Sequence, residues 1–400
     1  MMELLCPAGS LLGAKTAVDY GADAIYMAGE SFGMRTAAAF KNDDIINALE
    51  YAHNKNVAVH ITCNTLSHND DIAKLPEYLT FLNDLKPDAL IVADMGTIML
   101  CKKYAPDIPL HISVQSGIVN YETARAYYEL GAQRVVLARE LTLDEIAEIR
   151  AKTPNELELE AFAHGALCIS YSARCLLSDY LTGRDANRGA CAQSCRWKYA
   201  LVEESRPGEY LPIAQDDTGS YILNSYDLCM AEHLTDMQNA GVDSIKIEGR
   251  AKSEYYVAVV TNAYRHALDL IKDDKPFENW IMDELNTISH RPYGQGFYYG
   301  KPKNQQNYET AGYIRDYAVA AIVDDYKDGY IIATIKNKFL CGTVLYCLQP
   351  FSKPIEINTD LMFYIENNKI DMANKPMTQI KIPFDTPVNK SAFLRMKVQA

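Results

Sequence analysis

The first 275 residues alternate between short apolar segments and longer amphipathic ones, and this alternation restricts the fold more than any other feature. The apolar segments are rich in β-branched and aromatic residues, as expected of strands buried on both faces. The segments between them have the length and the apolar spacing of helices. We predict strands at Glu3–Leu5, Ala24–Met27, Val57–Thr62, Ala89–Ala93, Leu110–Val114, Arg134–Ala138, Leu157–Ala161 and Ser244–Ile247.

Glycine positions support this order of elements. Gly21, Gly131 and Gly241 each follow a predicted helix and precede a predicted strand, as expected of glycines that end helices. Eight strand–helix units and a long closing helix near Ser253–Lys272 predict a (β/α)8, TIM-like barrel over residues 1–275. A doubly wound open sheet is the alternative that alternation alone does not exclude.

Two regions depart from the repeat. An insertion at about 162–243 separates the last two strands, and insertions at the carboxyl ends of barrel strands build the active face. Residues 276–310 are rich in Gly, Pro and Tyr and predict a linker. Residues 311–400 show short alternating strands and an Asp328-Gly329 hairpin signal, which predict a small all-β barrel domain.

Charge and composition restrict the partners. The formal net charge is −13, so no overall positive field attracts nucleic acid or an anionic membrane, and any RNA contact has to be local. No signal peptide and no run of eighteen apolar residues is found, so we expect a cytoplasmic protein with no membrane partner. In that reducing compartment, clustered cysteines indicate a metal or catalytic site rather than disulfides.

Four cysteines, Cys168, Cys175, Cys191 and Cys195, lie within 28 residues of the insertion, and Cys229 follows. Thiolates are soft ligands that suit zinc, copper(I) or iron–sulfur clusters. Paired zinc ligands usually stand two to four positions apart, which holds only for Cys191 and Cys195. The spacing therefore favours an iron–sulfur cluster, while zinc and unligated thiols stay open.

The same region carries a family resemblance. The segment ELEAFAHGALCISYSARCLLSDYLTGRDANRGACAQSCRWKY, with ELLCPAGS, HISVQS, ARELTLDEI, NSYDL, SIKIEGR and NYETAGY, resembles the collagenase-like peptidase family U-32 along essentially the whole chain. Within the family, the chain is most similar to the members that hydroxylate tRNA. The resemblance implies a barrel with a small β domain and a 4Fe-4S cluster. It also implies oxygen-independent formation of 5-hydroxyuridine at the wobble position, with prephenate as co-substrate.

The resemblance leaves the fourth ligand and the partners open. In the tRNA-hydroxylating members the fourth cysteine matches Cys195, whereas in a ubiquinone-pathway relative it matches Cys229, and this chain has both. The implied partner is a tRNA anticodon loop, and some relatives also work with a related family subunit. Other relatives act on ribosomal RNA or ubiquinone precursors. Peptidase activity, the remaining alternative, rests on the family's name, because a cluster ligand such as Cys168 is not available as a nucleophile.

Polar residues at the ends of the predicted strands are the other site candidates, because strand ends converge on one mouth of a barrel. Arginine and lysine there suit the two carboxylates of prephenate. An alternative is that Lys246, Glu248 and Arg250 pair with one another. We expect Glu140, His164 and Glu248 to be catalytic, and Arg35, Gln115, Lys246 and Arg250 to bind substrate.

A local excess of basic residues surrounds the cysteines. Arg174, Arg184 and Arg188, with Arg196 and Lys198, face only Asp179 and Asp185 in this segment. They predict contacts with RNA phosphates, although these cations could equally offset the anionic thiolates. A target base would have to be unstacked to reach a barrel mouth, which is easiest in a single-stranded loop.

Overall fold

The computed structural model describes residues 2–30, 32–33, 39–168, 170–197, 200–201, 211–212, 226–301 and 313–398. The chain forms two compact units. The first comprises Met1–Val18, Asp23–Lys252 and Arg291–Gly312, and the second comprises Asp19–Ala22, Ser253–His290 and Tyr313–Ala400. Each unit is described by itself. In the part of the chain that the structure describes, no helix is long and apolar enough to cross a membrane.

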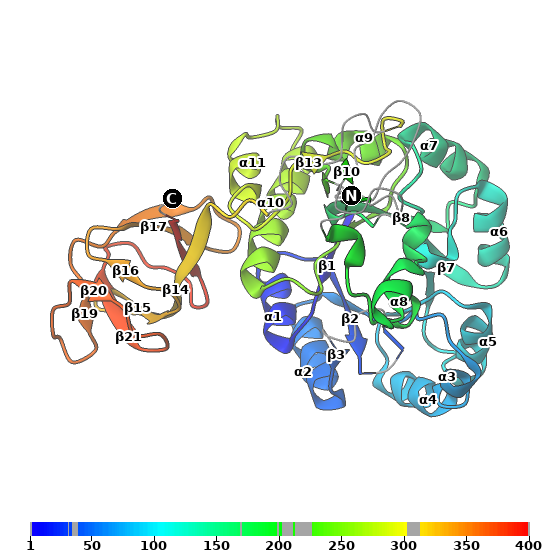
Figure 1. Cartoon of the computed structure of the whole chain (residues 1–400), viewed down its shortest axis with the longest axis horizontal. Coiled ribbons are helices and arrows are strands. Elements are labelled where there is room, and N and C mark those ends of the chain that lie inside the picture. Colours follow the sequence, from blue (N-terminus) through cyan, green and yellow to red (C-terminus); the bar gives the residue numbers. More distant parts are fainter. Residues whose placement is uncertain are drawn as a thin grey trace. The chain divides into compact units, whose positions relative to one another are not determined.

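The first unit is a closed barrel of eight parallel strands (Figure 1). The strands pair in the order β12-β1-β2-β4-β5-β6-β7-β8, and β8 pairs in turn with β12, which closes the ring. This closure confirms the predicted TIM-like barrel and excludes the open sheet. The strands are β1 (Glu3–Pro7), β2 (Ala24–Gly29), β4 (Ala58–Cys63), β5 (Ala89–Val92), β6 (Leu110–Ile112), β7 (Ala132–Val136), β8 (Glu158–Ala166) and β12 (Ser244–Ile247).

Helices surround these strands (Figure 1). Gly131 and Gly241 lie between the end of a helix and the start of the next strand. Their φ angles of 88° and 86° are those expected of glycines that end helices. Thr142 begins α7 with a reciprocal capping box to Glu145. The helices are α1 (Leu11–Asp19), α2 (Asn42–His53), α3 (Asn69–Ile72), α4 (Leu75–Leu85), α5 (Met95–Tyr104), α6 (Tyr121–Glu129), α7 (Leu143–Lys152) and α9 (Leu234–Asn239).

Turns predominate in the described residues of the insertion after β8. These residues contain the short helix α8 (Leu177–Thr182) and the 3-10 turns Tyr171–Ala173, Ala186–Arg188 and Ser194–Arg196. The insertion returns to the barrel through β11 (Asp227–Cys229), which runs antiparallel to β8 and pairs with β13 (Tyr293–Gly294). The remaining short strands are β3 (Ala39–Phe40), which pairs with β2, and β9 (Ala200–Leu201) with β10 (Leu211–Pro212).

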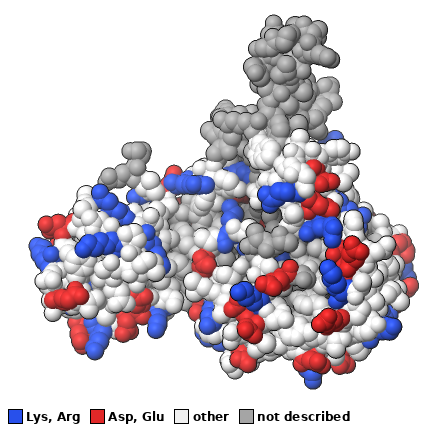
Figure 2. All heavy atoms as spheres, turned by 60° about the horizontal axis from the view of Figure 1, so that its bottom comes forward, with Lys and Arg blue, Asp and Glu red and all other residues white. Residues whose placement is uncertain are grey.

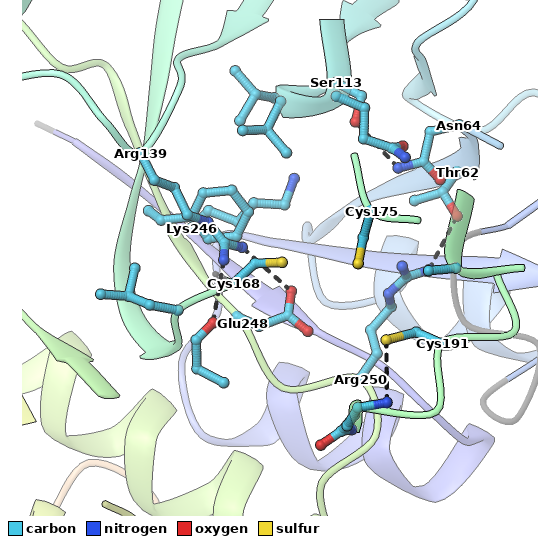
Figure 3. A pocket seen from close by; sticks show the side chains of 18 of the residues that line it. Thr62, Asn64, Ser113, Arg139, Cys168, Cys175, Cys191, Lys246, Glu248 and Arg250 are labelled. Atoms are coloured by element: carbon cyan, nitrogen blue, oxygen red, sulfur yellow. Dashed lines mark hydrogen bonds and ion pairs between the residues drawn. The ribbon is translucent and has the colours of Figure 1, made fainter. Parts of the chain in front are cut away.

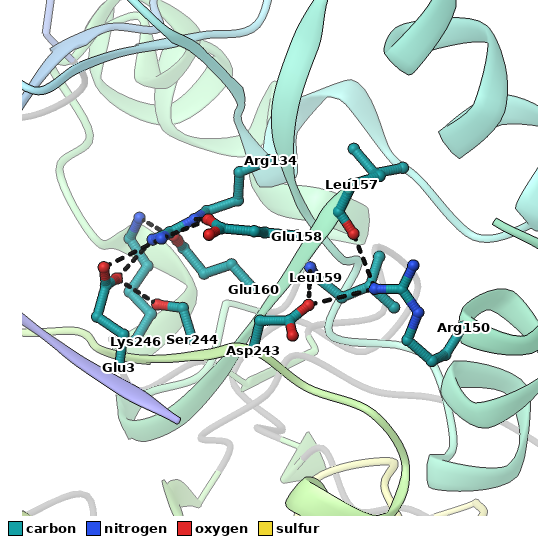
Figure 4. Close-up of polar contacts among 10 residues, drawn as sticks. All are labelled: Glu3, Arg134, Arg150, Leu157, Glu158, Leu159, Glu160, Asp243, Ser244 and Lys246. Atoms are coloured by element: carbon teal, nitrogen blue, oxygen red, sulfur yellow. Dashed lines mark hydrogen bonds and ion pairs between the residues drawn. The ribbon is translucent and has the colours of Figure 1, made fainter. Parts of the chain in front are cut away.

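The interior of the barrel contains a buried ion network near the amino ends of the strands (Figure 4). Arg134 Nε lies 2.7 Å from Glu158 Oε2, and its Nη2 lies 3.0 Å from Glu3 Oε2. Arg134 Nη1 also donates to Glu160 Oε2 at 3.1 Å. Glu160, which is fully buried, accepts a second bond from Lys246 Nζ at 2.6 Å. The network therefore extends from Glu3 and Glu158, at the amino ends of β1 and β8, to Lys246 on β12.

The second unit is an antiparallel half-barrel with two helices, α10 (Glu254–Lys272) and α11 (Trp280–Leu285). Asn262 of α10 accepts from the Phe351 N–H at 2.8 Å, and Arg395 Nη2 donates to Glu284 Oε2 at 2.6 Å. Asp328 and Gly329 have φ of 52° and 78°, as the predicted hairpin requires. The sheet order is β18 (Ile355–Asn358), β17 (Val344–Leu348), β22 (Phe393–Lys397), β14 (Tyr317–Lys327), β15 (Tyr330–Ile335), β21 (Gln379–Pro383) and β19 (Phe363–Tyr364).

A separate pair of strands, β16 (Phe339–Leu340) and β20 (Met372–Ala373), completes this unit. The sequence analysis assigned α10 to the barrel domain, whereas here α10 groups with the half-barrel. The domain boundaries drawn from the sequence stay a prediction.

Candidate functional site

A pocket of about 130 Å³ opens at the carboxyl ends of the barrel strands (Figure 3). Its walls come from residues at or just after the ends of five strands, including β4, β6 and β12, and from the cysteine-bearing insertion. This is the end of a TIM-like barrel at which active sites are found. The pocket is therefore the candidate active site.

All four clustered cysteines, Cys168, Cys175, Cys191 and Cys195, line this pocket. Cys175 is fixed by Asn187, whose Oδ1 accepts from its N–H and whose Nδ2 donates to its carbonyl, both at 3.0 Å. Cys191 Sγ accepts a hydrogen bond from the Gln193 N–H at 3.4 Å. The insertion thus folds so that thiols far apart in sequence reach one cavity.

The thiols influence one another electrostatically. Burial raises the pKa of Cys168, and the charges of Cys175 and Cys191 raise it further, while the Ser170 N–H and the Arg139 guanidinium act in the opposite direction. Among the described residues, no group of three His, Cys, Asp or Glu side chains could hold a single metal ion. All four cysteines nevertheless line the same cavity.

Cys229 and His164 occupy a different place. They lie opposite each other in the β8–β11 pairing, and neither is among the residues that line the pocket. The His164 ring lies 5.4 Å from the Tyr293 ring, and the Cys229 thiol contributes to raising the pKa of Tyr293, which burial raises most. The catalytic role of His164 and the ligand role of Cys229 stay predictions.

One wall of the pocket is charged. Arg139 stacks over Phe162 at 3.7 Å and lies 3.9 Å from Glu248 Oε2. Glu248 Oε2 also accepts from the Tyr26 hydroxyl at 3.5 Å. The sequence analysis predicted Glu248 but missed Arg139, although Arg139 directly precedes Glu140 in the quoted ARELTLDEI motif.

Lys246 belongs to the same wall, whereas Arg250 lies on the side of Thr62 (Figure 3). Burial lowers the pKa of Lys246, although the paired Glu160 carboxylate acts against it. Lys246 Nζ lies 4.4 Å from the centre of the Tyr26 ring, and Arg250 Nη1 donates to Thr62 Oγ1 at 3.2 Å. Lys246, Glu248 and Arg250 therefore each have a partner outside the trio.

The residues after β4 and β6 form the opposite wall, whose polar side chains are uncharged apart from the neighbouring Arg250 (Figure 3). Asn64 Nδ2 donates to Ser113 Oγ at 3.1 Å, and both residues are buried. Asn64 Oδ1 is buried and has no hydrogen-bond partner in the described part of the chain. Gln115, which the sequence analysis predicted, lies beside Ser113 on this wall and is 1% exposed. Asn64 and Ser113 were missed, because uncharged residues just after a strand give no distinctive sequence signal.

The remaining predicted residues lie around the pocket. Glu140 Oε1 accepts from the Ser172 N–H at 2.9 Å, so its carboxylate holds the start of the insertion and is not part of the pocket lining. Arg174 is exposed, and its Nε donates to the Gln115 carbonyl at 2.7 Å. Arg35 and Lys198 lie outside the described residues.

The insertion also exposes large apolar side chains. Tyr171, Tyr180 and Trp197 are 56%, 85% and 50% exposed, and they accompany exposed Arg174 and Arg184. Arg184 Nε donates to the Ala190 carbonyl at 3.1 Å. Exposed Arg188 forms an ion pair with Asp71, in which Nη2 lies 2.9 and 3.0 Å from the two carboxylate oxygens. Figure 2 shows acidic and basic side chains interspersed over the visible face, so any anion recognition there has to be local.

Comparisons with known proteins agree with this description. The family model for peptidase family U32 matches residues 9–308, and the model for the U32 C-terminal domain matches residues 315–395. The chain is 33% identical to the tRNA hydroxylation protein P of Haemophilus influenzae, over 98% of this chain and 96% of that protein. It is 36% identical to the protein of the same name from Escherichia coli, over 87% and 86%. It is 38% identical to the Escherichia coli 23S rRNA 5-hydroxycytidine synthase, over 68% and 40%.

Proposed function

The chain belongs to peptidase family U32, and from this membership we propose that it hydroxylates a pyrimidine in RNA. More specifically, the proposed reaction hydroxylates the 5-position of a wobble uridine in tRNA. It uses prephenate as co-substrate and does not require molecular oxygen. The observation that carries the proposal is one pocket that combines four cysteines with a cationic wall. The names of the relatives, which refer to hydroxylation of tRNA and rRNA, support the choice of RNA.

The cysteines suit a 4Fe-4S cluster better than a single ion. The ligands of one zinc ion must meet at a point, with sulfur about 2.3 Å from the metal. A cluster is larger and takes thiolates from several positions of one cavity, and Cys168, Cys175, Cys191 and Cys195 all line this pocket. Such a cluster supplies one-electron redox chemistry when bound. The Arg139 guanidinium beside Cys168 would offset part of its negative charge.

The charged wall suits a small dicarboxylate. Arg139, Lys246 and Arg250 are three cations around one cavity, and guanidinium groups bind carboxylates through two parallel hydrogen bonds. Tyr26 and Phe162 provide aromatic surface beneath them. Glu248 is the carboxylate that lines the same space, so it is the candidate for accepting a proton from the substrate.

The exposed insertion suits an RNA strand. Arginine side chains neutralise phosphates, and exposed aromatic rings stack on unpaired bases. Tyr171, Tyr180 and Trp197 provide such rings in the same insertion as the exposed Arg174 and Arg184. We therefore propose that this surface holds a single-stranded loop while one base enters the pocket.

Reversing the charge of Arg184 tests this RNA surface. We expect Arg184→Glu to weaken tRNA binding about tenfold at low salt and to reduce the slope of log affinity against log salt by about one, because one phosphate contact is lost. Arg188 should contribute less, since Asp71 already neutralises it. The measurement is fluorescence anisotropy of labelled tRNA at several salt concentrations.

Arg125→Glu is the matched control, because Arg125 is an exposed arginine on α6 outside the insertion. The RNA surface is misplaced if Arg184→Glu and Arg125→Glu bind tRNA equally well.

Peptide hydrolysis, which the family's name suggests, has little support in the described structure. A cysteine protease needs a thiolate and an imidazole in contact. Cys168 lines the pocket, whereas His164 packs against Tyr293 and is not part of its lining. The proposal of a related family subunit as partner stays a prediction from the resemblance.

A further inference from the structure

The two walls of the pocket differ in the charge of their side chains, and this difference indicates which kind of ligand each wall binds. Arg139, Glu248 and Lys246 make one wall ionic. Asn64 and Ser113, which follow β4 and β6, are polar but uncharged and line the pocket away from these three residues, with Arg250 bonded to the nearby Thr62. An anionic co-substrate is stabilised by the cations of the first wall, whereas an amide and a hydroxyl suit a neutral heterocycle.

Asn64 is held in a defined orientation. Its side chain is 8% exposed, and Nδ2 donates to Ser113 Oγ at 3.1 Å (Figure 3). Ser113 itself is 2% exposed, so the pair cannot move freely into solvent. This arrangement leaves the second Nδ2 hydrogen and the Oδ1 acceptor available to a molecule in the pocket.

Asn64 Oδ1 is the feature that points to a ligand. It is a buried amide oxygen with no hydrogen-bond donor among the residues that the structure describes. A buried polar atom without a partner costs about 1–3 kcal/mol, and such atoms are rare in folded proteins unless a ligand or water completes them. Because Asn64 lines the pocket, a molecule bound there can supply the missing donor.

The chemistry of Asn64 matches one pyrimidine better than the other. The edge of uracil offers an N3–H donor next to a carbonyl acceptor, whereas cytosine offers an unprotonated N3 and an amino donor at position 4. An asparagine amide can accept from N3–H through Oδ1 while it donates to the adjacent carbonyl through Nδ2. In the orientation in which Nδ2 donates to Ser113 Oγ, the amide can make this pair of bonds with uracil and not with cytosine.

We propose that Asn64, oriented by Ser113, binds the edge of an unstacked uracil and selects it over cytosine. This inference rests on the proposed function, because it assigns the wall of Asn64 and Ser113 in the same pocket to the RNA base. The charged wall then remains for the anionic co-substrate. Asn64 and Ser113 are binding and positioning residues in this assignment, and neither is required to move a proton.

The test is a binding competition between two anticodon stem-loop RNAs that differ only in uridine or cytidine at the target position. The full-length protein is purified without oxygen, and hydroxylation of each RNA is measured in parallel. We expect the wild-type protein to prefer the uridine RNA at least about tenfold, the discrimination typical of a good two-bond contact. Asn64→Asp should lose or reverse this preference, because a carboxylate cannot donate to the uracil carbonyl and can accept from the cytosine amino group.

Ser113→Ala and Asn155→Asp complete the experiment. Ser113→Ala removes only the group that orients the amide and should reduce the preference several-fold, so it decides the question if Asn64→Asp fails to fold. Asn155→Asp adds the same charge at an exposed turn and should keep the wild-type preference. A wild-type protein with no preference, or an unchanged preference in both pocket variants, overturns the inference. Selective binding of the uridine RNA without hydroxylation would instead refute the proposed function and leave the inference standing.

Discussion

Cys191→Ser protein is expected to contain little iron and to lose hydroxylase activity by more than about 100-fold, since even outer-shell changes at metal sites cost 10–100-fold. The physical reason is that Cys191 lines the pocket and its sulfur is already oriented by the Gln193 N–H. A serine hydroxyl keeps a similar size but is a poor ligand for iron. Iron and sulfide analysis, with an absorption spectrum of protein purified without oxygen, measures the effect.

Cys341→Ser is the matched control for this result. Cys341 lies in the second unit and its sulfur donates to the Asp360 carbonyl, a bond that serine can replace. It should retain the iron content of the wild type. Full iron in Cys191→Ser, or an equal loss in Cys341→Ser, would contradict the assignment of the cluster to the insertion.

The same measurement decides the fourth ligand. Cys195 lines the pocket, whereas Cys229 lies on β11 opposite His164, so we expect Cys195→Ser to lose iron and Cys229→Ser to retain most of it. Loss of iron in Cys229→Ser alone would show that the pattern of the ubiquinone-pathway relative applies here.

Arg134→Leu is expected to lower the free energy of unfolding by about 3–5 kcal/mol, the usual cost of removing one partner from a buried ion pair. Arg134 is 5% exposed and binds Glu3, Glu158 and Glu160 at once. Without it, Lys246 is the one ion-pair partner left to the buried Glu160 carboxylate among the described residues. Urea unfolding followed by circular dichroism gives the change in stability.

The network has an internal control. Glu158 is 47% exposed, so Glu158→Gln should cost under about 1 kcal/mol, as expected for a solvent-accessible ion pair. If Arg134→Leu and Glu158→Gln shift the unfolding midpoint equally, the buried network does not stabilise the barrel as described.

The barrel was predictable because local sequence patterns, the apolar segments and the helix-ending glycines, mark most of its strands and helices. The predicted strand Ser244–Ile247 matches β12 to the residue, and the predicted strand Ala89–Ala93 exceeds β5 by one residue. Local signals such as Gly241, which follows the helix before β12, mark these boundaries. By contrast, β11 and β13 are short strands, and β11 forms only by pairing with distant β8 and β13. No local pattern in the sequence encodes such pairings.

The site was predictable only in part, for a related reason. Clustered cysteines and charged strand ends are visible in a sequence, so the candidates included Cys168, Lys246 and Glu248. Asn64 and Ser113 were not visible, because their proximity depends on the positions of β4 and β6 around the closed ring. The partnership of Lys246 with Glu160 was missed in the same way, since it joins residues on two strands 86 positions apart.

The central claim is hydroxylation of RNA at this pocket, and the most direct test is mass spectrometry of tRNA nucleosides. A bacterial strain whose own family U32 tRNA hydroxylase has been deleted is grown without oxygen and supplied with this chain or with its Cys191→Ser variant. The account predicts that 5-hydroxyuridine-derived nucleosides return with the wild-type chain and not with the variant. Their absence when the wild-type protein is made, or their equal return with Cys191→Ser, would contradict it.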